Sequence, residues 1–399
     1  MKTAMPTTPS ADRLTAELAD ELQAIAATGL TRRRRVLETP CSRDATVDGK
    51  KVLNFASNDY LGLASNTEIA GALADGAKKW GVGSGASHLV SGHLAPHEAL
   101  ENEIAAFTGF ARALTFSTGY LANLAVTPTL AGRGDAVFAD KLNHASLIDA
   151  MQLAKANGAD VQRYPHNDVA ALEKLLAAST AGRKIIVTDT VFSMDGDLAP
   201  LPLLFALAER YDAWLVIDDA HGFGVLGPQG RGSLAHFNLP ASPRILLMGT
   251  LGKAAGVGGA FVAGSATAID YLLQKGRAYI FTTAAPPAIA CALSKSLQLI
   301  ANGDALRTNL MARIAQLRDG LTGLPYSLLP SPTAIQPLIV GANEAAVALS
   351  TALWERGLWV PAIRPPTVPK GTARLRISVS AAHTAADIDT LITALKEST

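Results

Sequence analysis

Residues 184–222 read "KIIVTDTVFSMDGDLAPLPLLFALAERYDAWLVIDDAHG", and this stretch decides the fold class of the chain. Residues 184–190 and 213–219, at its two ends, are short apolar runs of the kind that form buried strands. Between them, residues 202–211 repeat apolar side chains at helical spacing. A strand, a helix and a second strand in this order predict two parallel strands joined by a crossover helix.

The same alternation extends in both directions along the chain. Further apolar runs of strand length lie at 113–117, 135–140, 160–165, 244–249 and 259–264, with helical patterns such as 167–179 between them. We therefore predict an α/β fold with a mainly parallel seven-stranded sheet between helices and a smaller C-terminal α+β domain. The expected division is an N-terminal helix and arm at 1–50, a large domain at 51–288 and a small domain at 289–399.

Polar residues follow five of the predicted strands directly. They are Ser117 and Thr118, Asp140 to His144, Ser193, Asp218 to His221, and Thr250 to Lys253. Ligands of open α/β sheets bind outside the carboxyl ends of the strands, so these residues predict one shared site at that edge.

Lys253 lies in "MGTLGKAAG", residues 248–256, among small and apolar neighbours. The stretch lacks the spacing of a phosphate-binding P-loop, because Gly249 and Gly252 are too close and Ala254 follows the lysine. A sheltered lysine of this kind can form a Schiff base with an aldehyde. The alternative is an ordinary surface lysine in a glycine-rich turn.

The neighbouring strand ends carry groups that complement such a lysine. Asp218 can pair with a protonated pyridine nitrogen, although metal chelation with His221 and a helix cap are alternatives. The Ser-Thr-Gly turn before residue 120 favours binding of one phosphate at a helix start. His144 can stack on an aromatic ring, act as acid or base, or cap a helix.

Two further groups of side chains have less specific patterns. His93 and His97 have i, i+4 spacing but lack the H-E-x-x-H pattern and have Pro96 between them, so we predict no metal site. Arginines 32–35 form a cationic run that either binds an anionic group or is simply solvated. Arg364 precedes two prolines, which stiffen the backbone and fix the direction of the guanidinium. A guanidinium held in this way is suited to bidentate binding of a carboxylate.

The chain as a whole excludes several classes of function. Its 399 residues have a formal net charge of +1, which argues against nucleic acid as a partner. It has two cysteines, too few for a disulfide framework, no signal-peptide pattern and no apolar run of about 18 residues. We expect a cytoplasmic protein that does not bind membranes.

A lysine, an aspartate, two histidines and a phosphate cradle together describe a site for pyridoxal 5′-phosphate (PLP). From about residue 30 onward the chain resembles the α-oxoamine synthases, which have the fold-type I, aspartate aminotransferase-like architecture of PLP-dependent enzymes. The motifs that carry this resemblance are "NFASNDYLGL", "FSTGYLAN", "LNHASLIDA", "VFSMDGD", "IDDAHGFGVLG", "GTLGKAAG", "YIFTTAAPP" and "AIRPPTVPKGTARLRIS".

The resemblance implies a role for each matching residue that contacts the cofactor. Lys253 bonds to PLP and then moves the α-proton of the substrate, and Asp218 pairs with the pyridinium nitrogen. The remaining cofactor residues are His144 on the ring face, His221 and Ser193 at the phenolic oxygen, and Gly119, Tyr120 and Thr250 at the phosphate and ring edge. Thr282 or Thr283 reaches the phosphate in the neighbouring subunit, which implies a homodimer with active sites at its interface.

The resemblance also implies the substrates. Asn58, His144 and Arg364 hold the amino-acid carboxylate, and Arg32, or an arginine within a residue or two of it, anchors a distal carboxylate of the acyl chain. Residues 362–369, "AIRPPTVP", are similar to the family member that condenses L-alanine with pimeloyl-CoA or a pimeloyl-carrier protein. Alternatives are sister enzymes such as 2-amino-3-ketobutyrate CoA ligase, an aminotransferase, and a non-catalytic binding subunit.

Overall fold

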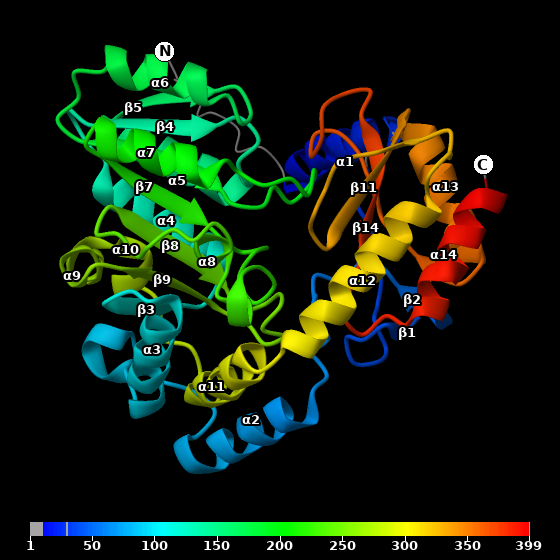
Figure 1. Ribbon diagram of the computed structural model, residues 1–399, viewed down its shortest axis with the longest axis horizontal. Helices are drawn as coiled ribbons and strands as arrows, with labels where there is room; N and C mark the ends of the chain where they lie inside the picture. The colour runs from blue at the N-terminus through cyan, green and yellow to red at the C-terminus, as the bar shows by residue number, and fades with distance from the viewer. Residues whose placement is uncertain (1–10, 29–30, 399) are drawn as a thin grey trace, which may run out of the picture.

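The computed structural model describes residues 11–28 and 31–398 (Figure 1). Residues 1–10 of the expected N-terminal arm lie outside the described residues. A large sheet with its helices occupies one side of Figure 1, and a smaller sheet with helices α12 (Asp304–Gly320), α13 (Asn343–Glu355) and α14 (Ala385–Glu397) occupies the other.

The large sheet contains the seven strands that the apolar runs predict. They are β3 (Arg112–Phe116), β4 (Ala136–Asp140), β5 (Asp160–Tyr164), β6 (Lys184–Asp189), β7 (Ala213–Asp218), β8 (Ile245–Thr250) and β9 (Ala260–Gly264). Their order across the sheet is β3-β9-β8-β7-β6-β4-β5. Strands β4 to β8 pair in parallel, and β9 is antiparallel to both of its neighbours. The predicted mainly parallel sheet is therefore confirmed.

Side chains of this sheet alternate between two hydrophobic cores, one on each face. In β6, Ile185 and Val187 pack into one core and Ile186 packs into the other. One face is covered by α4 (Gly119–Leu130), α5 (Ala145–Ala156) and α9 (Ala266–Lys275). The other face is covered by α3 (Ala95–Thr108), α6 (Val169–Ala178), α7 (Leu201–Arg210), α8 (Ser233–His236) and α11 (Pro287–Ala301). Burial on both faces explains why the inner strands are largely apolar rather than alternating, whereas the edge strand β5 is only partly buried and contains polar residues.

The smaller lobe is the predicted α+β unit. A four-stranded antiparallel sheet has the order β10 (Ser327–Leu328), β11 (Ile335–Gly341), β14 (Ala373–Ser378) and β13 (Ala362–Ile363). Its helices are α12 (Asp304–Gly320), α13 (Asn343–Glu355) and α14 (Ala385–Glu397). A second sheet joins β1 (Asp44–Val47), β2 (Lys50–Asn54) and β12 (Leu358–Trp359), so segments from both ends of the chain pair there.

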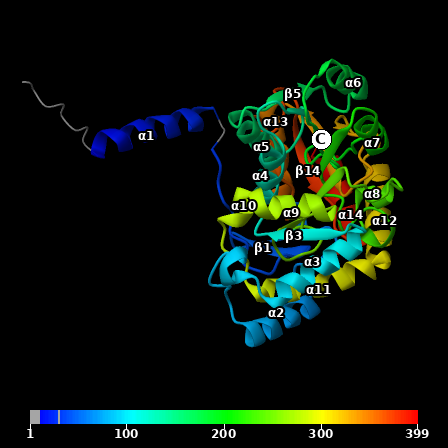
Figure 2. The same ribbon diagram turned by 90° about the vertical axis from the view of Figure 1, so that its left-hand side faces the viewer.

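The remaining helices lie at the periphery. They are α1 (Ala11–Ala27), α2 (Thr67–Trp80), α10 (Arg277–Ile280) and the single turns η1 (His88–Gly92) and η2 (Pro228–Gly230). Figure 2 shows α1 projecting away from the rest of the molecule. Its apolar residues Leu14, Leu18, Leu22 and Ile25 are all exposed.

The proposed division into domains stays a prediction. Strand β2 spans the expected boundary at residue 50, and α11 begins just before the expected boundary at residue 288. Helix α11 packs against α2 and α3 of the large lobe. Among the residues that the structure describes, no helix is both long and apolar enough to cross a membrane.

Candidate active site

A cavity lies where the carboxyl ends of β6, β7 and β8 meet the smaller lobe. Its lining includes five residues that the sequence nominated, Asn58, His144, Ser193, His221 and Lys253, together with Arg376. Because parallel strands end at the same edge of a sheet, residues far apart in the chain converge here.

Lys253 follows β8 in a tight, glycine-rich turn. Its Nζ lies 2.9 Å from Nε2 of His221. Burial lowers the pKa of Lys253 to about 8, although Asp218 and Asp189 oppose this by attracting the ammonium. The side chain therefore has a substantial neutral fraction near physiological pH, and a neutral amine is the nucleophilic form.

His221 is buried and connects Lys253 to the smaller lobe. Its Nδ1 lies 2.7 Å from the hydroxyl of Tyr60, which donates to Oδ1 of Asn58 at 3.1 Å. Because the hydroxyl proton goes to Asn58, the hydroxyl accepts the proton of Nδ1, and Nε2 is left to accept from Lys253. Burial, with Lys253 and Arg376 adding to it, lowers the pKa of His221 well below its usual value, so the ring is neutral.

Asp218 ends β7 with its carboxylate held in place from two sides. Oδ2 accepts from Nδ2 of Asn123 at 2.7 Å, and Oδ1 accepts from the backbone N–H of Ala220 at 2.9 Å. The adjacent Asp219 accepts instead from the backbone N–H of Ser233 at 2.9 Å, at the start of α8. Asp218 thus belongs to the hydrogen-bond network around the cavity, whereas Asp219 binds the backbone at the start of α8.

His144 caps the N-terminus of α5. Its Nδ1 accepts from the backbone N–H of Ser146 at 3.2 Å and lies 2.7 Å from the Ser146 hydroxyl. Burial lowers the pKa of His144, partly opposed by Asp218. Since Nδ1 acts as an acceptor, the neutral ring carries its proton on Nε2.

Asp189 was not predicted as a site residue, although it ends β6 as Asp218 ends β7. The two residues are paired in register on neighbouring strands. Oδ2 of Asp189 accepts from the backbone N–H of His144 at 2.6 Å, and burial with the nearby Asp218 charge raises the pKa of Asp189 well above its usual value. An aspartate at the end of a buried strand was the signal that could have identified it.

The predicted phosphate cradle lies at the start of α4. The Thr118 side chain accepts from the backbone N–H of Leu121 at 3.2 Å, and the helix begins at Gly119. A Cβ added at Gly119 would lie 3.8 Å from Cβ of Thr250, so these two residues are neighbours. Tyr120 is 42% exposed, and its hydroxyl donates to Asp149. The first N–H groups of a helix have no intrahelical acceptor and suit an anion.

Arg376 of β14 is the second site residue that the sequence reasoning missed. It is buried, and its Nε donates to the backbone carbonyl of Ser193 at 2.6 Å. Its Nη1 donates to Oδ1 of Asn58 at 3.0 Å. The guanidinium therefore joins the smaller lobe to the loop after β6 and contributes a fixed cation to the cavity.

Several nominated residues lie elsewhere in the described part of the chain. Arg364 is half-buried and lines a second cavity with Arg33, Arg35 and Trp354, while Arg32 is exposed. The two cavities share Pro361 in their linings. Thr282 is half-buried, whereas Thr283 is exposed, pairs with Ser87 and lines a third, mainly apolar cavity beneath α11.

Comparison with known proteins supports the resemblance seen in the sequence. Residues 50–395 match the family model "Aminotransferase class I and II". The chain is 85% identical over 386 residues to 8-amino-7-oxononanoate synthase of Dechloromonas aromatica, which covers 97% of this chain and 99% of that one. It is 62% identical to 8-amino-7-oxononanoate synthase of Herminiimonas arsenicoxydans, covering 95% of this chain and 98% of that one.

Among solved structures, a variant of serine palmitoyltransferase from S. paucimobilis with a bound PLP-myriocin aldimine superposes with a TM-score of 0.90 at 30% identity, covering 98% of both chains. The fold, the ordered motifs and the near full-length identity to curated relatives agree with one another. The chain belongs to the aminotransferase class I and II family and, within it, to the 8-amino-7-oxononanoate synthases.

Proposed function

We propose that this protein is a PLP-dependent acyltransferase of biotin biosynthesis. It condenses L-alanine with pimeloyl-CoA, or with a pimeloyl-carrier protein, and releases 8-amino-7-oxononanoate, CO2 and the free thiol carrier. The observation that carries the proposal is a buried lysine of lowered pKa, hydrogen-bonded to His221, in a chain 85% identical to a curated synthase of this product.

The residues around the cavity fit PLP by their chemistry. Lys253 offers an amine for the aldehyde, Asp218 a carboxylate for the pyridine nitrogen, and His144 a neutral ring for stacking. The other cofactor ligands in this proposal are Gly119, Tyr120 and Thr250 at the phosphate, and Ser193 and His221 at the phenolic oxygen. When bound, PLP supplies an electron sink for the carbanion at the α-carbon of the amino acid.

The protein then controls where protons and charges lie. Lys253, held by His221, takes the α-proton of alanine and later returns a proton to the product. Asn123 and Ala220 both donate to the Asp218 carboxylate, which fixes its position for pairing with the pyridine nitrogen. Because His221 is neutral, it accepts a hydrogen bond from Lys253 without adding a further positive charge to the cavity.

We assign the α-carboxylate of alanine to Arg376 together with Asn58. Both line the Lys253 cavity and are already hydrogen-bonded to each other at 3.0 Å. A buried guanidinium is a fixed donor fork suited to a carboxylate. This assignment moves the cation for that carboxylate from Arg364, which lines the neighbouring cavity, to Arg376.

The neighbouring cavity is suited to the far end of the acyl chain. It adjoins the Lys253 cavity at Pro361 and contains Arg33, Arg35 and Arg364. We propose that an arginine of the 32–35 run and Arg364 anchor the distal carboxylate of the pimeloyl group there. A homodimer in which Thr282 or Thr283 contacts the partner's cofactor completes the proposal.

The test is an absorbance spectrum of the purified protein, followed by titration with L-alanine and then pimeloyl-CoA. Before any amino acid is added, we expect a band near roughly 420 nm that Lys253→Ala abolishes, because a Schiff base of PLP absorbs there and Lys253 is the amine that forms it. CoA release should require alanine and pimeloyl-CoA together. Turnover on glycine with another acyl-CoA would point to a sister enzyme, and a protein that PLP cannot reconstitute would overturn the proposal.

A further inference from the structure

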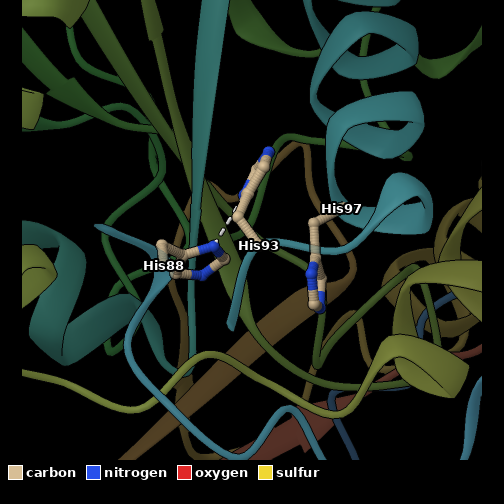
Figure 3. Close-up of side chains that lie close together, drawn as sticks. All are labelled: His88, His93 and His97. Atoms are coloured by element: carbon tan, nitrogen blue, oxygen red, sulfur yellow. Dashed lines mark hydrogen bonds between the residues drawn. The ribbon is translucent and has the colours of Figure 1, made fainter. Parts of the chain in front are cut away.

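His93 and His97, for which the sequence predicted no metal site, lie together with His88 beside α3 (Figure 3). His88 begins η1, His93 follows that turn, and His97 lies in the first turn of α3. Nδ1 of His88 and Nδ1 of His93 are 2.8 Å apart, and one ring nitrogen from each of the three histidines lies within 4.8 Å of the others. The intervening Pro96 sits at the start of α3, so the turn before it folds His93 back toward His97.

The distance between the Nδ1 atoms of His88 and His93 is close to the distance between two ligand nitrogens on one zinc ion. Zinc–nitrogen bonds are about 2.0–2.1 Å long, so two imidazole nitrogens on one tetrahedral ion lie roughly 3.3 Å apart. The separation of His88 and His93 therefore needs to open by only a few tenths of an ångström. For Nδ1 of His97 to bind the same ion, it must give up the hydrogen bond that it accepts from the backbone N–H of Leu94.

The outer hydrogen bonds also match those of metal-binding histidines. Nε2 of His93 bonds to Oε2 of Glu98 at 3.0 Å, and Nε2 of His97 donates to the backbone carbonyl of Ala285 at 2.8 Å. Carboxylates and carbonyls in these positions fix the ring orientation and leave Nδ1 as the ligand. The His88 ring is held differently, stacked on Tyr279 with centroids 5.0 Å apart.

The cluster can be reached from the surface of the protein. His97 is buried and His88 is half-buried, whereas 27% of the His93 side chain is exposed. An ion can therefore approach the three rings from the side of His93.

We propose that His88, His93 and His97 bind one divalent transition-metal ion of the zinc class through their Nδ1 atoms. Three imidazoles favour Zn2+, Co2+, Ni2+ or Cu2+ over Mg2+ or Ca2+, which prefer oxygen ligands. Three protein ligands leave a fourth position for water. The ion would tie η1 to α3 and, through the His97 bond to Ala285, to the loop after α10.

The experiment uses the purified holoenzyme, treated with a chelator, dialysed and then titrated with Co2+ alone. We expect one Co2+ per chain, with the visible d–d absorption of a four-coordinate site. His93→Gln and His88→Gln should each weaken Co2+ binding by about 100-fold or more. Glu98→Gln, which removes an outer partner, should weaken it by about 10–100-fold.

His236→Gln is the matched control, since this histidine lies in α8, outside the cluster. It should bind Co2+ as the unmodified protein does. A holoenzyme that retains no Co2+ would overturn the proposal, and so would equal retention by the His93 and His88 variants, which would locate the ion elsewhere. If His88→Gln does not fold, the variant at His93, whose side chain is partly exposed, still decides the question. None of these measurements depends on turnover, so they test the metal site separately from the proposed reaction.

Discussion

At the scale of single residues, we expect the pKa of Lys253 to control the rate at which the apoenzyme binds PLP. Burial brings its pKa from the ordinary lysine value of 10.5 to about 8, so roughly a tenth of the amine is neutral at pH 7. We expect the rate of PLP binding to the apoenzyme to rise with pH and to level off above a midpoint of about 8. Stopped-flow absorbance measures this rate. A midpoint near the ordinary lysine value would show that the side chain is solvated when it reacts.

Two arginines compete for the role of carboxylate ligand, and kinetics can separate them. Arg376 lines the Lys253 cavity, whereas Arg364 lines the neighbouring one. We expect Arg376→Lys to raise the KM for alanine about tenfold or more, because a lysine loses the planar fork. Arg364→Lys should raise the KM for pimeloyl-CoA instead. Initial rates with each substrate varied in turn check this, and the reverse pattern would return the α-carboxylate to Arg364.

At the scale of elements, the loop between β6 and α7 joins the two lobes. The carbonyl of Gly196 accepts from the hydroxyls of Ser331 and Thr333 at 2.8 and 3.0 Å. The same loop presents the Ser193 carbonyl to Arg376, and the Met194 carbonyl accepts from Arg374 at 2.8 Å. The position of Arg376 therefore depends on how closely this loop fits the smaller lobe.

Gly196→Ala tests that fit. Gly196 has a φ of +70°, and an added Cβ would lie 2.5 Å from the carbonyl oxygen of Ile335. We expect the free energy of unfolding to fall by about 1–3 kcal/mol and the KM for alanine to rise. Gly134→Ala is the matched control, because Gly134 has a φ of +88° with nothing within 4 Å of an added Cβ. Urea unfolding of both variants gives the comparison, and equal losses would argue against a packing role for Gly196.

His166, Asp140 and Asp197 form a charged cluster that also holds the loop between β6 and α7. His166 bonds to Oδ1 of Asp140 at 3.1 Å and to Oδ2 of Asp197 at 2.8 Å. Burial alone would lower the pKa of His166, but hydrogen bonds and attraction from both carboxylates raise it to about 10. The imidazolium is therefore the form that holds the end of β4, the loop after β5 and the loop after β6 together.

The raised pKa of His166 sets the pH range of its contribution. Its folded-state value lies above the unfolded value of 6.5, so the stabilisation is complete below pH 6.5 and is lost as pH rises toward 10. His166→Asn should lower the free energy of unfolding by about 1–3 kcal/mol at pH 6. The difference from the unmodified protein should shrink between pH 6.5 and 10. Urea unfolding across this range measures it, and a difference that does not change with pH would rule out the imidazolium.

At the scale of the whole molecule, we expect exposed apolar residues of two neighbouring segments to lie in the interface of the proposed homodimer. Val82, Val90 and Phe281 are 81%, 80% and 70% exposed. The segments that carry them are hydrogen-bonded to each other, since the N–H of Ala284 donates to the carbonyl of Ala86 at 3.0 Å. Exposed apolar side chains concentrated in this way mark protein–protein contacts. Phe281 also directly precedes Thr282, one of the two threonines assigned to the partner's cofactor.

Replacement of these residues tests the dimer. We expect Val90→Glu with Phe281→Glu to shift the protein toward monomers and to weaken PLP binding, because a charge in an apolar interface has no partner. Leu203→Glu is the control, since Leu203 is 56% exposed on α7, away from this surface. Sedimentation velocity and PLP titration are the measurements. A double variant that stays dimeric with unchanged PLP affinity would contradict this interface.

Much of the fold could be predicted because its signals are local. Most strands of the large sheet are short apolar runs, and the helices α6 and α7 between them have helical spacing of their own. The polar strand ends identified Lys253, Asp218 and His144 for the same reason. The antiparallel direction of β9 could not be predicted, because it depends on the connection from β8 and on pairing with β3, which lies far away in sequence.

By itself, the sequence determined the class of the fold, the edge of the sheet where the site forms and the chemistry of the residues on the strand ends. Only the tertiary structure decided that Arg376 faces Asn58 and Lys253, that Asp189 supports His144, and that three histidines meet beside α3. The physical reason is that periodicity and turn chemistry act over a few residues. Burial, the lowered pKa of Lys253 and the choice between arginines arise where segments distant in the chain are packed against each other.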